Sequence, residues 1–178
     1  MNWPSVTQVI NPYCDFSKIP PGVLLHASER GTEVHRLCLD IYAKGFPVFL
    51  SMPETQGYFD SFRRWFDKVV DTVIVTEERL TDLAFGYHGQ IDLLVKSKHG
   101  EILLVDLKTP LIKAKQWQTQ MAAYRHLVEK SEYPNPDRTG SLRLSPDGGI
   151  PTMDWYESHI EDFNIFLSCL NSYRYFKK

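Results

Sequence analysis

The sequence has few cysteines and no long apolar run, and both absences exclude classes of protein. Its three cysteines, Cys14, Cys38 and Cys169, lie far apart and form no Cys-x-x-Cys pair. We therefore expect neither a disulfide framework nor a four-thiolate zinc site, and we expect a reducing, cytoplasmic compartment. No apolar stretch approaches the roughly 18 residues of a membrane span. The first residues also lack the basic start and apolar stretch of a signal peptide, so no association with a membrane is expected.

A strong charge of one sign and low-complexity sequence are also missing. Twenty basic and 22 acidic residues give a net charge of −2, which excludes a generally basic nucleic-acid coat but leaves room for a local basic patch. Hydrophobic residues make up 43% of the chain and charged residues 24%, as in an average globular protein, so disorder and coiled coil fit poorly. The length of 178 residues predicts a single domain over residues 1–178.

The spacing of the hydrophobic residues changes along the chain from a helical to a strand period. Residues 1–27 contain four prolines and are expected to be irregular. The predicted elements are helices over 28–44 and 54–70, strands over 71–80, 85–96 and 101–108, a helix over 113–130, a loop over 131–140, strands over 141–144 and 152–156, and a helix over 158–175. This order predicts an α/β (α+β) fold with a central β-sheet, and the aromatic stripe of the second helix is interpreted as core packing.

Two isolated carboxylates interrupt strands that are otherwise apolar. Asp92 lies in the run IDLLV, and Asp106 lies in the run ILLVDLK. Strands that are apolar on both faces are buried, and an unpaired carboxylate is costly to bury. A short turn near residue 98 would place Asp92 opposite Val105 or Asp106, so the two acids should lie close together. Because two such carboxylates do not both ionise without a cation, the pair predicts a divalent metal, and oxygen ligands suit Mg²⁺ or Mn²⁺.

Lys108 should lie on the same face of its strand as Asp106, which it follows by two residues. A metal, carboxylates and a lysine are the parts needed to hydrolyse a phosphodiester: the metal binds the phosphate and acidifies a water, and the lysine orients that water or stabilises the developing charge. An Asp-x-Lys sequence alone is more often a solvated ion pair. The apolar flanks and the second acid favour a functional site.

The helix expected after these strands is basic and carries an aromatic residue. Between residues 108 and 130 there are five lysines and arginines and one acid. Basic and aromatic side chains together suit a phosphate backbone and stacked bases. The candidate nucleic-acid-binding residues are Lys113, Lys115, Gln116, Trp117 and Arg125. The alternative interpretation of this segment is a solvated helix face.

Five segments in order, RGTEVH, TEERL, GQID, VDLKT and QTQMAAY, resemble the motifs of the PD-(D/E)xK nucleases, and specifically those of their RecB-like exonuclease branch. The resemblance runs from about Pro4 to Tyr124. It implies a restriction-endonuclease-like catalytic core over 28–130, with a mixed sheet flanked by helices, followed by C-terminal strands and a helix over 138–178. It also implies a metal-dependent deoxyribonuclease, an exonuclease acting on single- or double-stranded DNA in recombination, repair or phage DNA processing. The location would be the cytoplasm of a bacterium or of a phage-infected cell.

The resemblance also implies a role for each motif residue. The metal ligands would be His35, Asp92, Asp106 and the backbone carbonyl of Leu107. Lys108 would be the catalytic lysine, and Gln120 and Tyr124 match the QxxxY motif, which supports the site and contacts DNA. Glu77 matches an acid of the preceding strand, although the adjacent Glu78 is the alternative. The nitrogen ligand from His35 makes Mn²⁺ more acceptable than at a site made only of oxygen ligands.

Two features found elsewhere in this branch are missing from the sequence. Some members hold an iron–sulfur cluster with four cysteines, and three separated cysteines argue against one here. No GxxxxGK(S/T) phosphate loop is present, so a helicase or annealing-protein partner would be a separate chain. The alternative function is a catalytically idle nucleic-acid-binding or scaffolding subunit of a recombination complex. Attack on ends or internal sites, DNA or RNA preference, and oligomeric state stay open.

Overall fold

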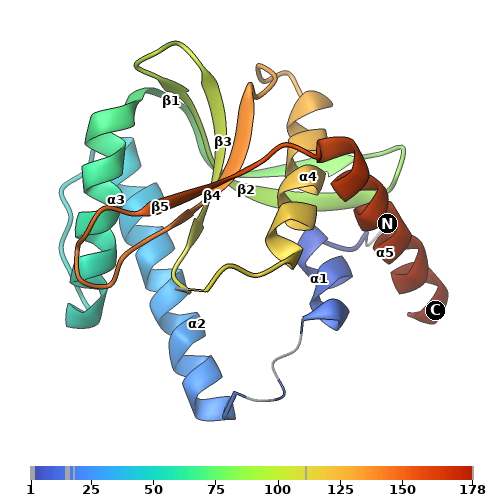
Figure 1. Cartoon of the computed structure of the whole chain (residues 1–178), viewed down its shortest axis with the longest axis horizontal. Coiled ribbons are helices and arrows are strands. Elements are labelled where there is room, and N and C mark those ends of the chain that lie inside the picture. The colour runs from blue at the N-terminus through green and yellow to red at the C-terminus, as the bar shows by residue number, and fades with distance from the viewer. Residues whose placement is uncertain (1–2, 15–16, 18, 111, 178) are drawn as a thin grey trace.

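A five-stranded sheet forms the centre of the molecule in the computed structural model, which describes residues 3–14, 17, 19–110 and 112–177 (Figure 1). The strands lie in chain order, so β3 is the central one. Neighbouring strands are antiparallel except for β3 and β4, which run parallel. The strands are β1 (Val70–Asp82), β2 (Tyr87–Ser97), β3 (Ile102–Lys108), β4 (Arg138–Arg143) and β5 (Thr152–Tyr156). The predicted mixed sheet flanked by helices is confirmed.

Helices cover both faces of this sheet and bury a separate apolar cluster on each. The helices α1 (Val6–Ile10), α4 (Gln116–Glu129) and α5 (His159–Phe176) pack on one face. The helices α2 (Pro21–His35) and α3 (Gln56–Val69) cover the other face. The α4 helix also makes the crossover that the parallel pair β3 and β4 requires. None of the described helices combines the length and the apolar character needed to span a membrane.

The N-terminal region is more regular than the prolines predicted. Residues 1–27 were expected to be irregular, but Ser5 caps α1 with its side chain, and α2 begins at Pro21 rather than at residue 28. Proline suits the first turn of a helix because its missing N–H needs no partner there. The chain continues past His35 as a π-helical segment, Arg36–Ile41, and a 3₁₀ turn, Tyr42–Lys44. The helical span ends at Gly45, with φ of 79°, as predicted.

The remaining elements lie close to their predicted positions, with two differences. The predicted helix over 54–70 begins with a 3₁₀ turn, Pro53–Thr55, and its aromatic stripe packs in the core as interpreted. The expected loop over 131–140 ends early because β4 begins at Arg138, which pairs with Leu103 on β3. A parallel partner so far away in the chain leaves no signal in local spacing.

Candidate active site

The register of the sheet places polar residues in a row across its strands. Leu93 pairs with Val105, so the next position on each strand sets Asp92 opposite Asp106. Asp106 pairs with Ser141 on β4, which pairs with Asp154 on β5. Of the two predicted registers, with Asp92 opposite Val105 or opposite Asp106, the observed pairing of Leu93 with Val105 agrees with the second.

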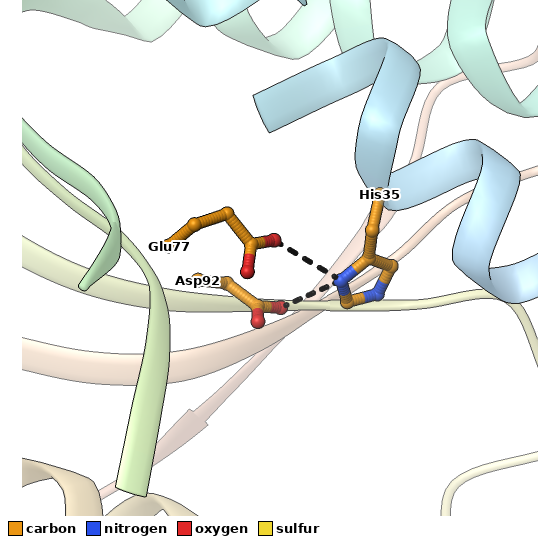
Figure 2. Close-up of side chains that lie close together, drawn as sticks. All are labelled: His35, Glu77 and Asp92. Carbon is orange, nitrogen blue, oxygen red and sulfur yellow. Dashed lines mark ion pairs between the residues drawn. The ribbon is translucent and has the colours of Figure 1, made fainter. Parts of the chain in front are cut away.

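Three possible metal ligands meet at one end of this row, where α2 ends over β1 and β2 (Figure 2). Nδ1 of His35 lies 3.6 Å from Oδ2 of Asp92 and 3.8 Å from Oε1 of Glu77. Ligand atoms of these three residues all lie within 4.8 Å of one another. Of the two adjacent glutamates, Glu77 is the one that joins this group. We name His35, Glu77 and Asp92 the metal group.

The backbone of β3 ties Asp92 and His35 together. Oδ2 of Asp92 accepts a hydrogen bond of 2.7 Å from the N–H of Leu107. The carbonyl oxygen of Leu107 lies 3.2 Å from Nε2 of His35. The carbonyl proposed as a ligand is therefore next to the metal group.

Asp106 and Lys108 form a second, more deeply buried set of contacts. Oδ2 of Asp106 lies 2.6 Å from Nζ of Lys108, which also donates a hydrogen bond of 3.0 Å to Oε1 of Gln120. The amide of Gln120 donates to Oδ1 of Asp106 at 3.4 Å and to the hydroxyl of Tyr124 at 3.1 Å. The four residues form one connected network, and Asp106 is only 3% exposed. Among the described residues, Asp106 is not in the metal group, because its carboxylate pairs with the lysine.

The carboxylates and His35 shift each other's proton affinities. Burial disfavours a charged His35, but nearby carboxylates, Asp92 first, outweigh it and raise its pKa to about 9. Burial raises the pKa of Asp92 to about 7, reinforced by the charge of Asp106 and opposed by His35. In the absence of a metal, the imidazolium of His35 is thus the cation beside the carboxylates of Asp92 and Glu77 at pH 7.

The donor set of the metal group fits a divalent cation. It offers one imidazole nitrogen and two carboxylates from three different elements, and Asp92 is buried beside His35. Nitrogen and oxygen ligands of this kind suit Mn²⁺, and the carboxylates alone suit Mg²⁺. Two of the predicted metal ligands, His35 and Asp92, lie in this group together with Glu77, and the other two, Asp106 and the Leu107 carbonyl, lie next to it.

Glu77 reaches the metal group through an unusual backbone conformation. Its φ is 52°, the single positive φ of a non-glycine residue in the described chain. The side chain is held in place by the amide of Gln90, which donates to its carboxylate. A left-handed residue within a strand costs about 1–2 kcal/mol, and such strain is common at functional sites. The conformation turns one acid of the edge strand β1 toward His35.

Two of the predicted nucleic-acid-binding residues make contacts within the protein. Trp117 was expected to stack on a base, but it is only 7% exposed and packs in the core, with Nζ of Lys108 5.4 Å from its ring centre. Arg125 pairs with Glu129 at 2.7 Å and contacts Thr139 and His159 on the side of α4 toward β4 and α5. The prediction for Trp117 is therefore corrected, since its ring belongs to the core, whereas a DNA contact by Arg125 stays a prediction.

The other three candidates lie at the start of α4, close to the network. Lys115 is exposed, Gln116 is half-buried, and Nζ of Lys113 lies 3.6 Å from Oδ1 of Asp154. Asp154 and Arg143 were missed by the sequence analysis. The alternating polar positions of the run SLRL, Ser141 and Arg143, were the available signal that one face of this strand is polar.

Acids and a lysine on neighbouring central strands of a mixed sheet are the parts that metal-dependent hydrolysis of a phosphodiester needs. The model of the PD-(D/E)XK nuclease superfamily matches residues 52–152, more than half of the chain, so the chain belongs to this superfamily. Its members are typically nucleases that use divalent metals. A search of curated proteins found no match. Among solved structures, the crystal structure of SSO0001 is similar at 13% identity and a TM-score of 0.36, covering 58% of this chain and half of that one.

Proposed function

We propose that this chain is a metal-dependent deoxyribonuclease of the RecB-like branch, an exonuclease that hydrolyses phosphodiester bonds in DNA recombination, repair or phage DNA processing. The observation that carries the proposal is the placement of the metal group beside the Asp106–Lys108 pair. A location in the cytoplasm of a bacterium or a phage-infected cell belongs to the same proposal.

The metal would be held by His35, Asp92 and Glu77, with the Leu107 carbonyl and Asp106 next to them. The chemistry that Mg²⁺ or Mn²⁺ supplies at such a site is Lewis acidity toward the scissile phosphate and a lowered pKa for a bound water. For His35 to bind the metal it must first lose the proton that the surrounding carboxylates stabilise. An iron–sulfur cluster is not part of the proposal.

Lys108 supplies the positive charge for the reaction. Its ammonium contacts Asp106 and Gln120, and it also lies 5.4 Å from the ring centre of Trp117. A fixed cation in a nearly dry site stabilises developing negative charge far better than a hydrated one. Gln120 and Tyr124 are positioning residues in this scheme, because they act on the substrate through Lys108 and Asp106. Lys113, Lys115 and Gln116, just before and at the start of α4, are the proposed contacts to the DNA strand.

The test is cleavage of end-labelled linear DNA and of closed circular DNA with Mg²⁺, Mn²⁺ or EDTA. Asp92→Asn and Lys108→Ala should each abolish cleavage, and Lys68→Ala, on α3 across the sheet, should leave it unchanged. Cleavage of linear DNA alone, dependent on metal and on both residues, supports the exonuclease. Cleavage of circles keeps the chemistry and makes the protein an endonuclease. Full activity of either site variant would overturn the assignment.

The alternative function is that of a catalytically inactive nucleic-acid-binding or scaffolding subunit with the same fold. Calorimetry with Mn²⁺ separates the two, because an idle site should bind the metal poorly. Tight DNA binding without cleavage in any metal favours the alternative. Co-purification with a helicase or an annealing protein would indicate a subunit of a larger complex.

A further inference from the structure

A second polar cluster lies next to Lys108 on the outer strands of the sheet. Arg143 on β4 pairs in register with Lys108, two residues beyond the pair Asp106 and Ser141. Nε of Arg143 lies 2.6 Å from Oδ2 of Asp154, and Nζ of Lys113 lies 3.6 Å from Oδ1 of the same carboxylate. Nζ of Lys113 also lies 4.8 Å from the ring centre of Tyr156 on β5.

Two buried hydroxyl groups beside this cluster have spare hydrogen-bonding capacity. Oγ of Ser141 and the hydroxyl oxygen of Tyr156 lie within hydrogen-bonding reach of each other, and neither has another hydrogen-bond partner in the part of the chain that the structure describes. The charge of Asp106 acts on Tyr156 as well. Only one of the two O–H groups can donate to the other oxygen, so the second is left without an acceptor and indicates that something absent from the chain itself accepts its hydrogen bond.

The charges around the hydroxyls select an anion. Among the residues that the structure describes, Lys113 and Arg143 share the carboxylate of Asp154, so this group of three side chains has one positive charge in excess. Lys108 is already balanced by Asp106. A cation at this point would meet three basic side chains, whereas an anion would accept hydrogen bonds from two cations and from one hydroxyl.

The cluster is separate from the metal group. Asp92 and Asp154 are three strands apart in the same row, and a spacing of about 4.8 Å per strand puts them roughly 14 Å apart. A phosphate bound between Lys113 and Arg143 is therefore not the phosphate being cleaved. Because a DNA strand carries a phosphate at every nucleotide, another one lies along the path of the same strand.

We propose that Lys113, Arg143, Ser141 and Tyr156 form a second phosphate subsite, which holds a phosphate of the DNA strand at a distance from the scissile one. The inference rests on the proposed function and adds the part of the substrate that positions the strand. The phosphate is either the terminal one of a strand end or one within the backbone. Both have the same chemistry, and the experiment separates them.

The experiment measures binding of a short, internally labelled single strand in EDTA, where no metal-dependent cleavage occurs. The strand carries a 5′-phosphate, a 3′-phosphate or no terminal phosphate. The proteins are the wild type, Lys113→Ala, Tyr156→Phe and the control Lys68→Ala. Lys113→Ala should weaken binding about tenfold and reduce the salt dependence of log K by about 0.7, the loss of one phosphate contact on a single strand. Lys68→Ala should change neither.

Tyr156→Phe guards against a merely structural effect. It keeps the ring and removes only the hydroxyl, so DNA binding should weaken at temperatures where its melting curve shows the variant to be fully folded. Weaker binding only to strands with one kind of phosphorylated end identifies a terminal phosphate, and weaker binding to all three strands identifies a backbone phosphate; either supports the subsite.

Unchanged affinity and unchanged salt dependence in both variants overturn the subsite. A wild-type protein that cleaves DNA in the earlier assay while the variants bind normally refutes this inference alone. A protein that binds DNA through the subsite but never cleaves it refutes only the nuclease proposal, and one that binds no DNA refutes both.

Discussion

Truncation of Lys108 should destabilise the metal-free protein as well as abolish cleavage. The side chains of Lys108 and Asp106 are 15% and 4% exposed, and their charged atoms lie 2.6 Å apart. Lys108→Ala leaves Asp106 with the amide of Gln120 at 3.4 Å as its remaining side-chain hydrogen bond in the described chain. Removing one partner of a buried ion pair costs about 3–5 kcal/mol, because the other charge stays buried and uncompensated. We expect a loss of about 3 kcal/mol in EDTA.

Urea unfolding in EDTA measures this loss, and a thermal scan should show a fall of about 6–12 °C for a chain of this size. The single variants Asp106→Asn and Lys108→Met and their double variant form a double-mutant cycle. The double variant removes both charges and should recover most of the stability, so the two sites should couple by more than about 1 kcal/mol. A loss below about 1 kcal/mol for Lys108→Ala, or losses that simply add in the double variant, would refute the argument. Inactivity of Lys108→Ala is thus evidence for catalysis only at a temperature where the variant is folded.

Three further predictions follow from the site and its supporting structure. Binding of Mn²⁺ at pH 7 should release about 1.5 protons, because metal ligands bind deprotonated, His35 with a pKa of about 9 is charged at this pH, and Asp92 with a pKa of about 7 is half protonated. The affinity for Mn²⁺ should therefore rise with pH up to about 9. Calorimetry in two buffers of different ionisation enthalpy counts the released protons, and a count near zero would contradict the prediction. Glu77→Gln should weaken Mn²⁺ binding by at least about tenfold in the same titration without loss of stability, and unchanged affinity would remove Glu77 from the metal group. Gly57→Ala should lower the free energy of unfolding by about 3 kcal/mol, because a Cβ at this position would lie 1.7 Å from a backbone oxygen. Gly22→Ala should raise it by about 0.5–1 kcal/mol, because a Cβ there would have no atom within 4 Å. Equal effects of the two variants on urea unfolding would contradict both predictions.

Local patterns in the sequence were enough to predict the centre of the site. The strand period of the two apolar runs placed Asp92 and Asp106 on neighbouring strands, and a turn of a few residues restricted their register to two choices. Lys108 followed from the same period. These contacts are close in the chain, so the spacing of side chains decides them.

The parts that could not be predicted depend on distant segments or on unusual backbone. The left-handed conformation of Glu77 leaves no mark in residue type, because glutamate has no preference for positive φ. The meeting of Lys113 with Asp154 depends on the parallel pairing of β3 and β4. The burial of Trp117 was within reach, since it lies four and seven residues from Met121 and Tyr124, a core spacing on a helix.

The central position of β3 has a consequence for how the site comes apart. Its amides are hydrogen-bonded to strands on both sides, and such amides exchange with solvent only when the whole domain unfolds. Glu77 lies instead on an edge strand, and His35 lies where α2 changes to a π-helical segment. We expect local opening at these borders to move Glu77 and His35 away from Asp92 while Asp106 and Lys108 stay in place. In hydrogen exchange, the amides around Glu77 and His35 should therefore exchange faster than the amides of β3 around Asp106 and Lys108.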